Sequence, residues 1–145
     1  MRIRLLLVVL CLVLGLQLPA QAVGTVTVTP NFDRWPIVSY TVAWTATAGG
    51  AVSGNAFHVT PGRLLLIRFD PGTPQPTADY DVTLVESGGV ADLTAGGGTD
   101  LSNAADEVWQ WDPPLWQDGT RALDVVVANA GNATAGTVTI LVEVQ

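Results

Sequence analysis

The chain has very little cysteine, histidine and positive charge. It contains one cysteine, one histidine, six arginines and no lysine, against thirteen acidic residues. The cysteine is Cys11, so residues 23–145 have none and cannot be cross-linked by a disulfide. The stability of this part must therefore come from packing.

The shortage of positive charge excludes two classes of partner. Residues 23–145 carry four arginines and thirteen carboxylates, which gives a formal charge of 4 − 13 = −9. Nucleic acids and anionic lipids are bound through lysine and arginine side chains that neutralise phosphates. We therefore expect neither nucleic acid nor a membrane as a partner, and we attribute the acidity mainly to solubility.

The single histidine argues against catalysis. A nucleophilic serine, cysteine or threonine needs a base, and the one available, His58, lies in a strand-like run. No serine of the chain lies in a G-x-S-x-G motif. One histidine without a cysteine after residue 22 leaves no zinc or copper site. Paired aspartates acting on a glycosidic bond stay as a remote alternative, because thirteen carboxylates make some close pair expected by chance. We expect a protein that is not an enzyme.

The chain has one long apolar run, residues 5–16, near its N-terminus. Its length of about twelve residues falls short of the about twenty that cross a bilayer. Two arginines precede it, and Ala20-Gln21-Ala22 follows with the small-x-small pattern that signal peptidase recognises. The sequence predicts a cleavable signal peptide over residues 1–22 and a secreted protein, extracellular or periplasmic, that begins at Val23.

Most of the remaining chain alternates apolar and polar residues with a period of two, which is typical of strands with one buried face. The clearest case is residues 37–46, whose apolar face would comprise Val38, Tyr40, Val42, Trp44 and Ala46. Residues 25–29 and 137–144 show the same pattern, and we expect them to be outer strands. The continuous apolar runs at residues 64–67 and 125–127 indicate strands that are central or covered on both faces.

Turn residues separate these segments every eight to twelve positions, as in an all-β domain. The fold class that we predict is an antiparallel two-sheet β-sandwich formed by one domain, residues 23–145, and both immunoglobulin-like and jelly-roll topologies remain open. The proline-rich residues 70–77 should form an extended crossover. Residues 100–116 are the least regular part, with a short helical turn expected near residues 103–108.

Tryptophan is the most informative side chain for binding. Trp109 and Trp111 are two residues apart, and Trp116 follows a Pro113-Pro114 break. An exposed platform of these three rings would stack on sugars or anchor a protein, whereas the alternative is that the rings pack within the domain or against a neighbouring subunit.

A calcium ion is the one cofactor that the sequence suggests. Asp79 and Asp81 would share one face of a strand, and Asp70 or Asp92 would supply further hard oxygen ligands. The chain has no EF-hand loop, and aspartates on the outward face of a strand mainly aid solubility.

Several short segments of residues 38–144 carry a resemblance to a known group of proteins: Trp44-Thr45, Ala48-Gly49-Gly50, Pro71-Gly72-Thr73, Pro74, Pro76-Thr77, Asp79-Tyr80-Asp81-Val82-Thr83-Leu84, Asn129-Ala130-Gly131 and Gly136-Thr137-Val138. In these segments, which together span most of that range, the chain resembles small β-rich virion structural proteins of tailed phages and prophages. This resemblance implies assembly and supplies no catalytic residues. Virion proteins assemble in the cytoplasm, however, so the export signal favours a domesticated relative or an unrelated secreted sandwich.

The sequence as a whole predicts a secreted, non-enzymatic β-sandwich that associates with itself or with a larger protein assembly. Exposed edge strands of a sandwich suit such association. The alternative is a carbohydrate-binding or adhesion module that uses Trp109, Trp111 and Trp116, with a glycan as its partner.

Overall fold

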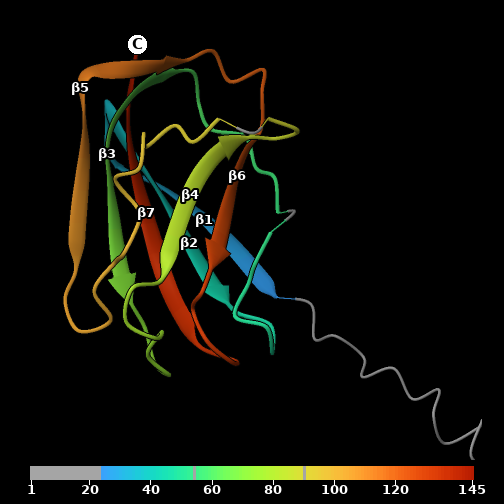
Figure 1. Ribbon diagram of the computed structural model, residues 1–145. Coiled ribbons are helices and arrows are strands. Elements are labelled where there is room, and N and C mark those ends of the chain that lie inside the picture. Colours follow the sequence, from blue (N-terminus) through green and yellow to red (C-terminus); the bar gives the residue numbers. More distant parts are fainter. Residues whose placement is uncertain (1–23, 54, 90) are drawn as a thin grey trace, which may run out of the picture.

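Seven strands form two antiparallel sheets in the computed structural model, which describes residues 24–53, 55–89 and 91–145 (Figure 1). The strands are β1 (Thr25–Arg34), β2 (Ile37–Thr45), β3 (Gly62–Pro71), β4 (Asp81–Glu86), β5 (Glu107–Gln117), β6 (Leu123–Ala128) and β7 (Ala135–Val144). The larger sheet has the order β1-β2-β7-β3-β5, and β4 pairs with β6 in front of it. The predicted all-β class is confirmed. The predicted signal peptide, residues 1–22, and the cleavage site before Val23 lie outside the described residues.

Two irregular segments flank the smaller sheet. Residues 52–57 bridge to β6 through the pairs Val52 with Val127 and Phe57 with Leu123. Residues 92–101 lie on the other side of β4, through the bridges Asp92 with Val85 of β4 and Leu101 with Tyr80, the residue before β4. The smaller layer is therefore about as wide as four strands, although only two of them are regular.

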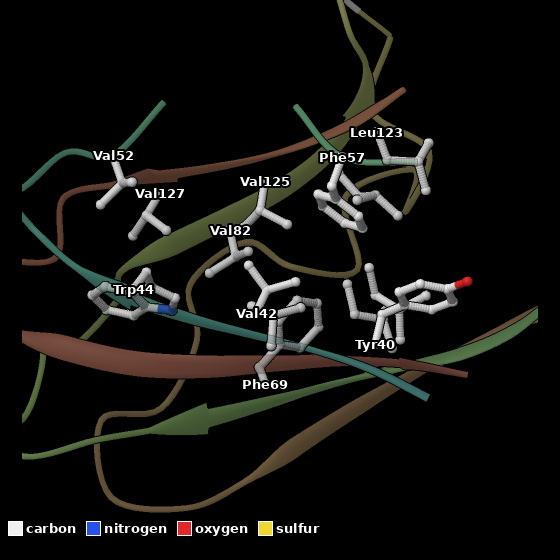
Figure 2. Packing of buried hydrophobic residues seen from close by; sticks show 14 of the residues in the cluster. Tyr40, Val42, Trp44, Val52, Phe57, Phe69, Val82, Leu123, Val125 and Val127 are labelled. Carbon is white, nitrogen blue, oxygen red and sulfur yellow. The ribbon is translucent and has the colours of Figure 1, made fainter. Parts of the chain in front are cut away.

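The core lies between the two sheets. All five residues predicted for the buried face of residues 37–46 are buried. Figure 2 shows three of them, Tyr40, Val42 and Trp44, on the side of the core opposite the β4 and β6 valines Val82, Val125 and Val127. The rings of Trp44 and Tyr80 meet across this core with centroids 6.0 Å apart. The period of two in the sequence thus correctly identified the inner face of β2.

A cross-strand pair of unequal size sits at one end of this core. Trp44 of β2 pairs with Gly136 of β7, and a Cβ atom at position 136 would overlap the indole. Glycine at this position gives the large ring the space that a side chain would fill.

One prediction about strand position was wrong, and another was confirmed. β7 lies at the centre of the larger sheet, and only β1 of the two segments predicted as outer strands is at an edge. The apolar run at residues 64–67 belongs to β3, which lies between β7 and β5, so its prediction as a central strand is confirmed. The run also contains a β-bulge, since Leu65 falls between the pairs Leu64 with Val142 and Leu66 with Leu141. An extra residue shifts the alternation by one position, so apolar side chains follow one another without both faces being covered.

The segment predicted to be irregular contains β5, and no helical turn occurs at residues 103–108. Four residues of β5, 111–114, lie between its pairs Gln110 with Leu66 and Leu115 with Leu64. This interruption contains both prolines. It breaks the alternation of apolar and polar residues, so the sequence pattern did not reveal the strand. Within the described ranges no helix is long and apolar enough to cross a membrane.

Candidate functional site

The three tryptophans of the predicted platform lie on two faces of the larger sheet. Trp109 pairs with Ile67, which is fully buried, and packs on the core side. Trp111 also packs against the core, and its Nε1 donates a hydrogen bond to the carbonyl of Leu93 at 2.6 Å. Trp116 pairs with exposed Arg63 on the outer face and is 51% exposed. The structure therefore brings Trp109 and Trp111 together and places Trp116 apart from them.

The aspartates predicted to hold calcium do not form one group. Among the described residues, no cluster of three or more histidine, cysteine or acidic side chains could hold a metal ion. Asp79 lies in a turn with a φ of 61°, so it does not alternate with Asp81 on a strand as the sequence suggested. The carboxylate of Asp81 accepts hydrogen bonds from the Asp100 N–H at 3.0 Å and from Asn129 Nδ2 at 2.7 Å. Asp70 lies 3.7 Å from the guanidinium of Arg68.

Asp92, the alternative ligand, organises a turn. Its carboxylate accepts hydrogen bonds from the N–H of Thr94 at 2.9 Å, from the Thr94 hydroxyl and from the N–H of Gly96 at 2.8 Å. Thr94 is fully buried, so the carboxylate satisfies polar groups that water does not reach.

A groove of about 530 Å³ lies on the outer face of the larger sheet. Its wall is the end of β1, which contributes Asn31, Asp33 and Arg34. Its floor comes from β2 and β7, which contribute Ile37, Ser39, Thr139 and Leu141. The register between β1 and β2 shifts between Asn31 and Arg34, and this irregularity shapes the wall.

The polar groups of the groove have free hydrogen-bonding capacity. Asn31 Oδ1 accepts the N–H of Asp33 at 2.8 Å, and this bond leaves the Asn31 amide N–H groups as donors. Among the described residues, no carboxylate lies within 4 Å of the Arg34 guanidinium, whereas Arg68 and Arg121 each pair with a carboxylate. The groove thus holds one cation and one anion that are not paired with each other.

The outer face of the larger sheet is nearly balanced in charge, unlike the rest of residues 23–145. Strand register, the groove and the ion pair of Arg68 with Asp106 place on it three of the four arginines, Arg34, Arg63 and Arg68, and four carboxylates, Asp33, Asp70, Asp106 and Glu143. The remaining Arg121 and nine carboxylates give 1 − 9 = −8. The negative charge of the domain is therefore concentrated away from this face.

Two exposed aromatic residues at the turn between β1 and β2 were missed by the sequence interpretation. Phe32 is 55% exposed and Trp35 is 67% exposed. The segment Asn31-Phe32-Asp33-Arg34-Trp35-Pro36 mixes aromatic and charged residues where two strands meet, and this combination could have identified a surface hairpin.

The two edges of the larger sheet differ in how they are protected. The edge strand β5 contains Pro113, Pro114 and two acidic residues, and its pairing is interrupted. The opposite edge strand, β1, has the uncharged sequence Thr25-Val26-Thr27-Val28-Thr29 before Pro30. Its threonine side chains are exposed, so this stretch presents a regular, uncharged strand edge.

Three titratable groups depart from their ordinary behaviour. Burial raises the pKa of Tyr80 to about 12, with additional contributions from the negative charges of Glu107, Asp70 and Asp106. Hydrogen bonds from Thr120 lower the pKa of Asp118, and the Glu86 carboxylate raises the pKa of Arg121. His58 is exposed, with its Nδ1 3.2 Å from the carbonyl oxygen of Gly119. None of these groups lines the groove.

In comparisons with known proteins, no protein-family model, curated protein or solved structure matches this chain. The resemblance to phage structural proteins therefore stays a prediction.

Proposed function

We propose that the protein is a secreted, non-enzymatic structural protein with a jelly-roll sandwich, which associates with itself or with a larger assembly through β1. The strand order supports the jelly roll. Strands β2-β7-β3-β5 face a layer in the order 52–57, β6, β4, 92–101. Along the chain these eight segments cross from one layer to the other at every step except from β4 to residues 92–101, as in two interlocked Greek keys. Jelly rolls include viral capsid and lectin domains, an analogy at the level of fold that is consistent with assembly.

The observation that carries the assembly function is the contrast between the two edges of the larger sheet. A regular, uncharged edge strand offers unpaired N–H and C=O groups to another strand, and proteins that must stay monomeric usually block such edges with charge, proline or bulges. β5 has all three features, whereas residues 25–29 of β1 have none of them. The exposed edge therefore serves for association.

Addition of a second copy at β1 would join two larger sheets across a two-fold axis. Antiparallel pairing of β1 with the β1 of a second copy forms the same hydrogen bonds in both directions, which a symmetric dimer requires. A strand of a larger assembly would use the same edge by β-augmentation. The outer face and its groove would stay accessible in both cases.

Sedimentation velocity of residues 23–145 over a range of concentrations tests this function. We expect a dimer that dissociates on substitution Thr27→Lys, because two lysines would face each other across the new strand pair. Thr137→Lys, on the central strand β7 of the same face, is the matched control and should leave the dimer intact. A monomer at all concentrations, or a dimer insensitive to Thr27→Lys, would contradict association through β1.

Export is tested separately by mass spectrometry of density-gradient fractions from a native culture. We expect a first residue of Val23. Migration with dense particles would support incorporation in a virion-like assembly, whereas free protein that retains Met1 would contradict export.

The alternative function, a carbohydrate-binding or adhesion module built on the three tryptophans, has support from Trp116 only. Its ring is half exposed on the outer face, whereas Trp109 and Trp111 contact the core. Loss of glycan or surface adhesion in Trp116→Ala, with folding unchanged, would favour this alternative.

A further inference from the structure

We infer that the groove on the outer face of the larger sheet binds a short, neutral glycan. This site does not depend on association through β1, and it uses none of the three tryptophans predicted from the sequence.

The shape of the groove suits a ligand of a few sugar units. Its volume of about 530 Å³ falls within the roughly 300–1,000 Å³ typical of ligand sites. Three strands build it, so its floor is part of a hydrogen-bonded sheet and does not depend on a loop. Ser39 lies between Asn31 and Leu141 in the ladder, and its small side chain leaves the hollow at the centre.

The polar groups of the groove match sugar hydroxyls, each of which both donates and accepts. Arg34 and the amide of Asn31 donate, Asp33 accepts, and the hydroxyls of Ser39 and Thr139 do both. The planar guanidinium and carboxylate groups each present two atoms, so that either can bind two neighbouring hydroxyls. An anion would use only the donors and would be repelled by Asp33.

The remaining groups fit the apolar side of a sugar ring and exclude highly charged ligands. Ile37 and Leu141 offer aliphatic surface for the C–H groups of a ring. The face around the groove carries three arginines and four carboxylates, while the rest of residues 23–145 is strongly acidic and repels polyanions. A neutral polyhydroxylated ligand meets both conditions.

Amide chemical shifts in ¹⁵N-labelled residues 23–145 provide the test. The probes are maltotriose, cellotriose and chitotriose, with trigalacturonate as the charged comparison. We expect at least one neutral trisaccharide to shift the amides of Asn31, Ser39 and Leu141. Its affinity should fall at least tenfold in Arg34→Met, and binding should be lost in Ser39→Phe, which fills the hollow.

Arg121→Met is the matched control, because Arg121 lies outside the groove and pairs with Glu86. It should bind as the unmodified protein does, and so should the Thr27→Lys variant, which separates this site from association through β1. No shift with any neutral trisaccharide would overturn the proposal, as would unchanged affinity in both groove variants. Tighter binding of trigalacturonate would also overturn it, by showing a site for carboxylates.

Discussion

The indole of Trp109 packs directly against Gly97, where any side chain would overlap the ring. Trp109 belongs to the edge strand β5, and Gly97 to the segment that flanks β4, so this contact joins the two layers at one side of the domain. Trp109 Nε1 is buried without a hydrogen-bond partner in the described part of the chain. The position of this ring is therefore set by the space above the glycine and not by a polar contact.

Substitution Gly97→Ala tests this contact. We expect a loss of about 1–3 kcal/mol in the free energy of unfolding, because the Cβ atom must displace the indole. Gly49→Ala is the control, since a Cβ there would lie 3.6 Å from the nearest atom, and it should change stability by less than about 0.5 kcal/mol. Urea denaturation measures the free energy of unfolding of both variants. A change in Gly97→Ala as small as that in Gly49→Ala would show that the indole moves without cost.

The separation of the tryptophans predicts unequal costs of removing them. Trp111→Ala should destabilise the protein by roughly 2–3 kcal/mol, since it removes partly buried surface and the hydrogen bond to Leu93. Trp116→Ala should cost less than about 1 kcal/mol because the ring is half exposed. Guanidinium denaturation followed by circular dichroism compares the two. A larger cost for Trp116 would contradict the assigned faces.

Removal of the Asp92 carboxylate should lower the free energy of unfolding, because this carboxylate accepts hydrogen bonds from buried polar groups of Thr94. In Asp92→Ala the buried hydroxyl and N–H of Thr94 lose their acceptor, and we expect a loss of about 1–3 kcal/mol. Asp118 makes the same pattern of hydrogen bonds to Thr120, which is exposed to water, so Asp118→Ala should have little effect on thermal stability. Similar shifts of the melting temperature in both variants would argue against burial as the cause.

The raised pKa of Tyr80 predicts that the protein loses stability at alkaline pH. Its pKa is about 12 in the folded protein and near 10 when unfolded, so above pH 10 the folded state binds more protons than the unfolded state. Its contribution is complete below pH 10, and stability falls as the pH rises toward 12, by roughly 2–3 kcal/mol. Tyr80→Phe should lessen this fall between pH 9 and pH 11.5 in urea denaturation. An equal fall of stability in Tyr80→Phe would show that the titration of other groups causes the fall.

The sequence identified the inner faces of strands but not their order. Alternation of apolar and polar residues follows from the pleat of a strand, which is local, and it correctly predicted the burial of Tyr40, Val42 and Trp44. It failed at Leu65 and at β5, where an extra residue or a proline pair changes the period. Such irregularities depend on the partner strand, which the local sequence does not specify.

The candidate sites, like the strands, could be predicted from the sequence only in part. That Trp109 and Trp111 share a face followed from their spacing, but which face they share, and that Trp116 lies on the other, depended on the pairing of β5 with β3. The groove joins residues of β1 and β2 to Thr139 and Leu141, about a hundred positions later in the chain. Sequence alone determined the all-β class, the strand faces and the acidity, because these properties are local or additive. Only the tertiary structure decided which edge is exposed and which side chains form a site, because strand pairing joins residues that are distant in the chain.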